Sequence, residues 1–204
     1  MKIKSLTKLV VTFILTFVGT SSYSNELKLG SDIPMADVKM RTTDDRQVSI
    51  NDIAGEKGTV VAFWCNHCPY VVASRERFTN YVNDFKDKGI SVIAINSNDP
   101  QIVAGDSLEK MKEFAKKYKY PYTYSIDQDA QIAKAFGAKK TPHIYLFDAN
   151  KKLVYVGAID DSVSNPKKVK EQYLKIATKE LLAGKNITKS NSKAIGCSIK
   201  WPKK

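Results

Sequence analysis

The feature that most constrains this chain is a pair of cysteines, two residues apart, at the end of a short apolar run. Residues 59–63 read Thr-Val-Val-Ala-Phe, and Cys65 and Cys68 follow almost at once. Apolar residues then recur on one helical face at Val71, Phe78, Val82 and Phe85. A buried strand, a Cys-x-x-Cys pair and an amphipathic helix, in this order, predict a dithiol that one backbone turn closes into a disulfide.

The two thiols are expected to differ in role. Asn66 is expected to cap the following helix, which would put Cys65 at the positive helix N-terminus, where a thiolate is stabilised. A protonated His67 would lower the pKa of this cysteine further, although an exposed turn residue without an electrostatic role is the alternative. Cys65 is therefore the candidate attacking thiol, and Cys68 the more buried, resolving thiol.

Two other functions of the cysteine pair, a structural disulfide and a zinc site, have little support in the sequence. A structural disulfide over so short a loop removes little chain entropy. Zinc would lack its remaining ligands, because the chain has no second Cys-x-x-Cys and no His-x-x-x-His motif. We therefore expect no cofactor and no resident metal ion.

Thr141-Pro142 opens a later apolar run and is the candidate second half of the site. An X-Pro bond in this position is a candidate cis peptide, which would let Thr141 pair with a bound substrate strand; a trans proline at a strand start is the alternative. His143 follows directly. If Pro142 faces the dithiol, both histidines of the chain lie near one site, where they could tune pKa values or bind a soft metal; His143 as a half-exposed strand residue is equally compatible.

Cys197 leaves an odd cysteine near the C-terminus. Three interpretations stay open: a third redox thiol folded back on the site, an intermolecular partner, or a buried small apolar residue. The last is slightly preferred.

Residues 1–24 predict a secretory signal peptide. Three lysines among the first eight residues precede an apolar run over residues 9–18, and small residues at 22–24 favour cleavage before Asn25. An uncleaved anchor is the alternative, and no later segment is apolar enough to cross a bilayer. Residues 25–204 are then expected to form a single domain with a C-terminal tail, located in the periplasm or secreted, where disulfides persist.

The net charge of +12 would fall to +9 without the leader, with 30 basic against 21 acidic residues. Only four of the basic residues are arginine, and no arginine–aromatic pattern is present. A solvated lysine surface is therefore favoured over nucleic-acid binding.

Strand and helix patterns alternate along the chain. A hairpin is predicted over residues 38–50, strands over 91–96, 122–126, 143–147 and 153–156, and helices over 108–118, 129–136 and 165–184. This order predicts an α/β fold with a mixed central sheet flanked by helices and an N-terminal hairpin extension.

Four segments together resemble the thioredoxin-like superfamily, in its redoxin branch of alkyl hydroperoxide reductase/thiol-specific antioxidant and TlpA-like proteins. The segments are residues 63–69 (Phe-Trp-Cys-Asn-His-Cys-Pro), 94–99, 141–148 and 196–201. The resemblance runs from about residue 27 to the C-terminus. It is strongest to peroxiredoxin-like proteins with the same Cys-Asn-His-Cys-Pro site.

This resemblance implies a thioredoxin-like fold, Cys65 as nucleophile, Cys68 as resolver and Pro142 in cis, with Trp64 and Thr141 against the substrate. Two departures from the family patterns matter. Thioredoxins carry a buried acid in the strand before the dithiol, and residues 59–64 contain none. Peroxiredoxins pair a Thr-x-x-Cys loop with a distant arginine, but here Cys65 replaces the threonine and no arginine follows Arg77.

The leading hypothesis is an exported thiol–disulfide oxidoreductase that exchanges electrons with protein or small-molecule thiols and disulfides through Cys65 and Cys68. The sequence identifies no upstream redox partner. The alternative is an antioxidant thiol peroxidase, in which Cys68 is oxidised by peroxide and Cys65 or Cys197 resolves it. A further alternative is a Cu(I) chaperone that uses the two cysteines and one histidine.

Overall fold

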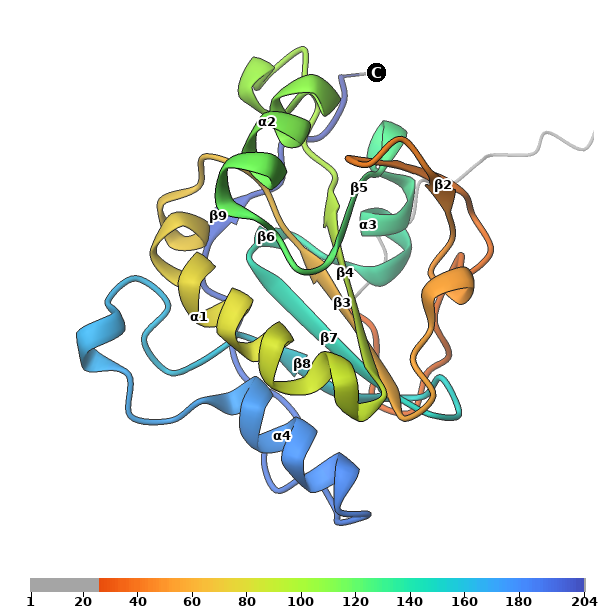
Figure 1. Cartoon of the computed structure of the whole chain (residues 1–204), viewed down its shortest axis with the longest axis vertical. Coiled ribbons are helices and arrows are strands. Elements are labelled where there is room, and N and C mark those ends of the chain that lie inside the picture. Colours follow the sequence, from red (N-terminus) through yellow and green to blue (C-terminus); the bar gives the residue numbers. More distant parts are fainter. Residues whose placement is uncertain (1–25, 204) are drawn as a thin grey trace, which may run out of the picture.

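A mixed β-sheet forms the centre of the structure, a computed structural model that describes residues 26–203 (Figure 1). Within these residues seven strands form the sheet, in the order β2-β1-β5-β4-β3-β7-β8. Their bounds are β1 Met40–Thr42, β2 Gln47–Val48, β3 Gly58–Phe63, β4 Ile90–Asn96, β5 Thr123–Ile126, β7 His143–Asp148 and β8 Leu153–Gly157. Strands β3, β4 and β5 run parallel to one another. On the other side of β3, β7 pairs antiparallel with β3, and β8 pairs antiparallel with β7.

Helices cover both faces of this sheet (Figure 1). Helices α1 (Pro69–Phe85), α2 (Leu108–Tyr118) and α4 (Tyr173–Leu182) contribute to the apolar cluster on one face. Helix α3 (Gln131–Phe136) and the N-terminal hairpin contribute to the cluster on the other face. The predicted α/β class, with its N-terminal hairpin, is confirmed.

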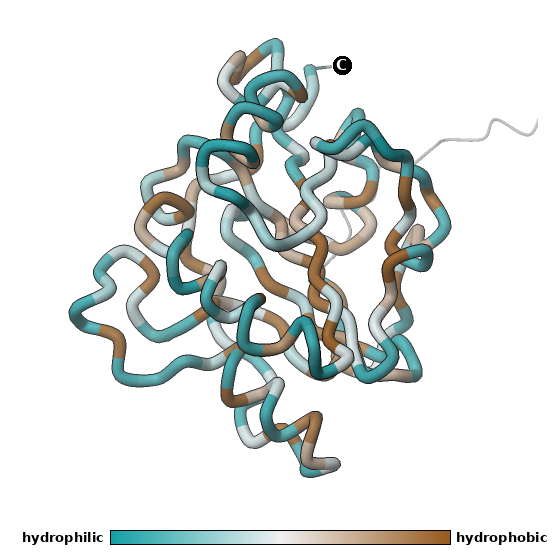
Figure 2. Tube along the Cα trace, viewed as in Figure 1, coloured by the Kyte–Doolittle hydropathy of each residue, from teal (hydrophilic) through white to brown (hydrophobic). Residues whose placement is uncertain are grey.

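Strand β3 is the central element, and its sequence explains why. All six of its residues are buried. Val60 and Ala62 belong to the cluster under α1, whereas Val61 and Phe63 belong to the cluster under α3, as the alternation of side chains along a strand requires. Figure 2 shows that the central strands are mainly hydrophobic and the outer turns mostly hydrophilic. The dithiol thus follows the most deeply buried strand.

The predicted helix over residues 108–118 is confirmed, and Ser107 caps it by accepting a hydrogen bond from the backbone N–H of Lys110. The predicted helix from Asn165 is wrong at its start. Asn165 caps only a short 3-10 turn, Pro166–Lys168, after which Val169 is extended. Helix α4 begins only at Tyr173.

The C-terminal tail contributes an element that the sequence did not predict. Strand β9 (Cys197–Ser198) pairs antiparallel with β6 (Lys140–Thr141), the two residues before Pro142. Residues far apart in the chain therefore lie side by side next to the dithiol (Figure 1).

The predicted signal peptide, residues 1–24, lies outside the described residues. Among residues 26–203, no helix combines the length and the apolar character that a bilayer span requires.

Candidate active site

The dithiol and the Thr141-Pro142 segment meet at the end of β3. Cys65 follows this strand, and the antiparallel register between β3 and β7 brings the start of β7 beside it. The Thr141-Pro142 bond is cis, as predicted. The Sγ of Cys65 lies 3.2 Å from the Thr141 hydroxyl, and the Sγ of Cys68 lies 3.2 Å from the Thr141 carbonyl oxygen. Thr141 therefore contacts both sulfurs.

Cys197 completes a cluster of three sulfurs. Its Sγ lies 2.7 Å from that of Cys68, because the pairing of Thr141 with Cys197 carries the tail over the site. Cys197 is partly exposed, so the preferred interpretation as a buried apolar residue is wrong. Of the three open interpretations, the geometry agrees with a thiol folded back on the site.

The start of helix α1 differs from the prediction. Cys68, not Asn66, is the N-cap residue, and Pro69 is the first helical residue. The Asn66 side chain is engaged elsewhere: its amide donates to the Gly105 carbonyl at 2.8 Å and accepts from the Tyr124 hydroxyl at 3.0 Å. The expected order of burial is also wrong, because Cys65 is 2% exposed and Cys68 6%.

These contacts shift the pKa values of the three thiols in different directions. Hydrogen bonds from Cys65, from Cys197 and from the backbone N–H groups of Val71 and Cys197 lower the pKa of Cys68 to about 5, against the effect of burial. The pKa of Cys65 is raised by its hydrogen bond to Cys68, by burial and by the charge of Asp106. Burial and the neighbouring Cys68 raise the pKa of Cys197 to about 11. In the reduced site, these contacts favour the charged form of Cys68 over that of Cys65.

The surroundings of His67 and Trp64 differ from those that the sequence analysis expected. His67 is exposed, and its ring packs edge-on against Phe114, 4.9 Å between centroids. The main groups that shift the pKa of Cys68 do not include it. Trp64 is fully buried and stacks on Phe78, so its predicted contact with a substrate is contradicted in this conformation.

His143 lies on the opposite face of the sheet from the thiols. It pairs in register with Phe63 and belongs with the apolar cluster under α3. Its Nε2 lies 2.8 Å from a carboxylate oxygen of Glu26, and this hydrogen bond lowers the pKa of Glu26. Of the two alternatives left open for His143, convergence of both histidines on the dithiol is excluded by this position, and the side chain is buried rather than half-exposed. Among residues 26–203, no three Cys, His, Asp or Glu side chains are arranged so that they could hold one metal ion.

Asp106 is the site residue that the sequence analysis missed. It is 1% exposed, and its two carboxylate oxygens accept hydrogen bonds from the backbone N–H of Asn66 and from the side chain of Asn98, each at 2.8 Å. The carboxylate thus holds the backbone of the Cys-x-x-Cys segment in place. The strand before the dithiol contains no acid, and nothing in the polar loop after β4 distinguishes Asp106 from the other acid there, Asp99.

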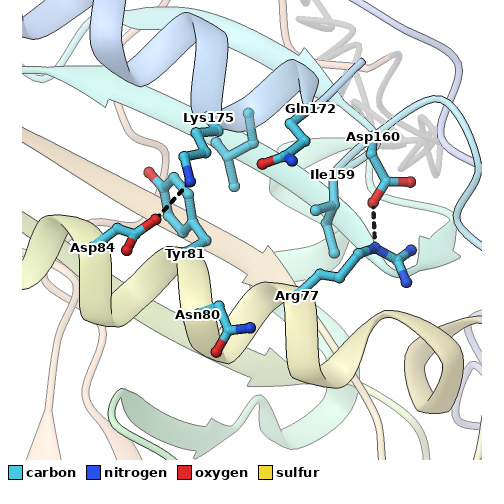
Figure 3. Close-up of a pocket in the computed structure, with 9 residues that line it drawn as sticks. Arg77, Asn80, Tyr81, Asp84, Ile159, Asp160, Gln172 and Lys175 are labelled. Atoms are coloured by element: carbon cyan, nitrogen blue, oxygen red, sulfur yellow. Dashed lines mark hydrogen bonds and ion pairs between the residues drawn. The ribbon is translucent and has the colours of Figure 1, made fainter. Parts of the chain in front are cut away.

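A cavity of about 190 Å³ lies between α1 and α4, lined by none of the cysteines (Figure 3). Its charged side chains are paired within the protein, Arg77 with Asp160 and Lys175 with Asp84, both at 2.7 Å. These pairs hold α1 against the segments that follow β8, and we assign the cavity a structural role.

A mixed sheet of this topology, a Cys-x-x-Cys pair at the start of a helix and a cis proline beside it define a redox protein with a thioredoxin-like fold. The particular family follows from the comparison with known proteins: residues 30–156 match the AhpC/TSA family, and the chain belongs to it.

Three relatives illustrate the range of this similarity. A crystal structure of an uncharacterized conserved protein from Geobacillus kaustophilus has a TM-score of 0.82 and 36% identity, covering 88% of this chain and 95% of that one. Thiol-disulfide oxidoreductase ResA from Bacillus cereus is 22% identical over 162 residues, 79% of this chain and 86% of the relative. Chloroplastic peroxiredoxin Q from Sedum lineare is 29% identical over 98 residues, 48% of each chain. The family resemblance read from the sequence is confirmed.

Proposed function

We propose that this chain is an exported thiol–disulfide oxidoreductase that passes electrons through Cys65 and Cys68. The observation that carries the proposal is the position of the two sulfurs, each 3.2 Å from Thr141 beside the cis proline. The oxidised pair would accept electrons from a partner thiol through a mixed disulfide, and the reduced pair would return them to a partner disulfide.

The order of attack within the pair follows from the charge distribution. The thiolate is the nucleophile in thiol–disulfide exchange, and the lowered pKa of Cys68 favours this residue in the reduced protein. Cys65 would then release the partner by attacking the mixed disulfide at Cys68. This is the reverse of the order that the resemblance implied.

Reduction of insulin disulfides tests the function, and trapping tests the order. In a Cys197→Ser background, which removes the neighbouring third thiol, Cys65→Ser and Cys68→Ser should each lose about 100-fold or more in activity, because neither single thiol completes the exchange. With Cys68 as attacking thiol, Cys65→Ser in this background accumulates the mixed disulfide on Cys68. Activity of Cys65→Ser equal to that of the background protein would reject the function, and trapping mainly in Cys68→Ser would restore the order implied by the family.

The leader supports the proposed location. Cell fractionation with mass spectrometry should find a mature protein that begins at Asn25 outside the cytosol, whereas a variant without residues 2–24 should stay inside. Recovery of full-length protein in the membrane fraction would favour the uncleaved anchor.

A thiol peroxidase remains the second candidate, because Cys68 stands at the N-cap of α1 with a pKa of about 5. Peroxide would oxidise this thiolate to a sulfenic acid, and a second thiol would condense with it to a disulfide and release water. Stopped-flow consumption of hydrogen peroxide by the reduced protein is the test. A rate no faster than that of a free thiol excludes this activity.

A further inference from the structure

The C-terminal tail occupies the strand position beside the cis proline. Strand β9 pairs Cys197 with Thr141, the residue that we expected to pair with a bound substrate strand. The approach is close: a Cβ on Gly196 would lie 2.1 Å from the Thr141 carbonyl oxygen. An extended segment of another protein could take this edge only by displacing the tail.

Contacts beyond β9 hold the tail in place. The backbone N–H of Lys200 donates to the side chain of Asn98, and its carbonyl accepts from the backbone N–H of Asp99, both at 2.8 Å. Ile199 is 3% exposed and belongs to the apolar cluster under α3. Asn98 also donates to Asp106, so the loop that supports the dithiol anchors the tail as well.

The alternation along β9 turns Cys197 toward the site and Ser198 away from it. The Sγ of Cys197 lies 2.7 Å from that of Cys68, whereas Ser198 is exposed and accepts a hydrogen bond from Lys140 at 3.1 Å. Cys65 and Cys68 are both buried, and Cys197 is the partly exposed member of the three. A partner can thus approach the tail cysteine more readily than the buried pair.

We propose that Cys197 is a third exchange thiol, which carries electrons between the buried Cys65–Cys68 pair and partners in solution. This inference rests on the proposed function of that pair. Partners would then need an accessible thiol or disulfide, but no extended strand to lie along Thr141.

The internal step is an exchange that needs no outside oxidant. The Cys197 thiolate attacks the Cys68 sulfur of the Cys65–Cys68 disulfide, the Cys68–Cys197 bond forms, and Cys65 leaves as a thiolate that takes up the proton lost from Cys197. A partner thiolate then attacks the sulfur of Cys197, which forms a Cys197–partner disulfide and releases Cys68 as a thiolate. A second partner thiol attacks the partner sulfur of this bond, so that the partner leaves as a disulfide and Cys197 returns to the thiol. In the opposite direction the same steps deliver a partner's oxidising equivalents to the buried pair.

Disulfide mapping of Cys65→Ser tests the contact directly. After mild oxidation with diamide, we expect a Cys68–Cys197 disulfide within the monomer. The matched control carries Cys65→Ser, Cys197→Ser and Ser198→Cys, which moves the tail thiol to the outward face of β9. It should form the bridge to Cys68 at least about tenfold more slowly. Equal rates in the two proteins, or bridges only between monomers, would overturn the proposal.

The kinetic test uses Cys197→Ser, which keeps the buried pair. We expect its Cys65–Cys68 disulfide to form, and its exchange with glutathione to be about tenfold slower than in the wild type. Exchange as fast as in the wild type overturns the role of the tail and leaves the proposed function standing. Failure of any variant, and of the wild type, to form the Cys65–Cys68 disulfide overturns both.

Discussion

The carboxylate of Asp106 accepts a hydrogen bond from the backbone N–H of Asn66, inside the Cys-x-x-Cys segment, at 2.8 Å. Its other oxygen accepts from Asn98, and the whole side chain is buried. A buried charge held in this way acts on its neighbours at low effective dielectric. Asp106 therefore holds the dithiol segment and helps to keep the proton on Cys65.

Asp106→Asn should lower the pKa of Cys65, because the substitution removes a negative charge that raises it. It should also lower the free energy of unfolding by about 1–3 kcal/mol, since an amide NH₂ would face one of the two former donors. The pH dependence of the ¹³Cβ shifts of labelled cysteines measures the first effect. Glu109→Gln, at an exposed position of α2, is the control, and equal shifts in both variants would contradict the role of Asp106.

Cys197→Ala should raise the pKa of Cys68 from its value of about 5, because the variant loses the contact between the two sulfurs that lowers it. A hydrogen bond to a charged group contributes about 1.5–3 kcal/mol, which corresponds to about one to two pKa units. The rate of Cys68 alkylation against pH gives the midpoint. Ser198→Ala should leave the midpoint in place, and an unshifted midpoint in Cys197→Ala counts against the contact.

Reduced protein should lose stability as the pH falls from about 8.5 toward 5. The pKa of Cys68 is lower in the folded state than in an unfolded chain, where it is about 8.5, so its thiolate contributes stability that is complete above that value and lost on acidification through about pH 5. Denaturant unfolding of the reduced wild type and of reduced Cys68→Ser at several pH values measures the difference. A difference that does not change between pH 8 and 5 would refute the lowered pKa.

Gly196→Ala should detach β9 from β6, since the added Cβ would lie 2.1 Å from the Thr141 carbonyl oxygen. The amide of Ile199, which donates to the Lys139 carbonyl at 3.1 Å, should then exchange its hydrogen faster. Ile195→Ala changes the preceding, exposed residue and should leave this amide protected. Full protection in Gly196→Ala would mean that the strand pair tolerates the methyl group.

Arg77→Ala should lower the free energy of unfolding by about 3–5 kcal/mol, because it leaves the buried Asp160 carboxylate without its cation. Arg77 also donates to the carbonyls of Ser162 and Val163, so the loop after β8 loses its attachment to α1. Asp84→Asn breaks the more exposed pair of the same cavity and should cost about 0–1 kcal/mol (Figure 3). Denaturant unfolding measures both losses. Similar losses in the two variants would show that burial does not make the Arg77–Asp160 pair contribute more to stability than the Lys175–Asp84 pair.

Local patterns were sufficient for most of the fold. The continuous apolar run of β3 predicted a buried central strand, and periodic apolar residues predicted α2 at its observed bounds. The start of α4 was wrong because Asn165 caps a 3-10 turn as readily as an α-helix, and only packing decides which of the two continues.

The candidate site was predictable where its residues are neighbours in the chain. The dithiol was predicted from a short motif, whereas the residues around Pro142 left cis and trans open and the family resemblance implied the cis bond. The cap at Asn66 was not, because Gly105 and Tyr124 engage its amide from other elements. Rules based on neighbouring residues do not predict that groups distant in the chain will bind the Asn66 side chain.

The sequence by itself determined that this chain builds a mixed sheet with a reactive dithiol at the end of a buried strand, because strand, turn and helix propensities act over a few residues. Only the tertiary structure decided that Asp106 supports that dithiol from a later loop and that Cys197, 129 residues beyond Cys68, closes over it. These two contacts join residues that are distant in the chain. They depend on the order of the strands and on their connections, which only the packing of the whole sheet fixes.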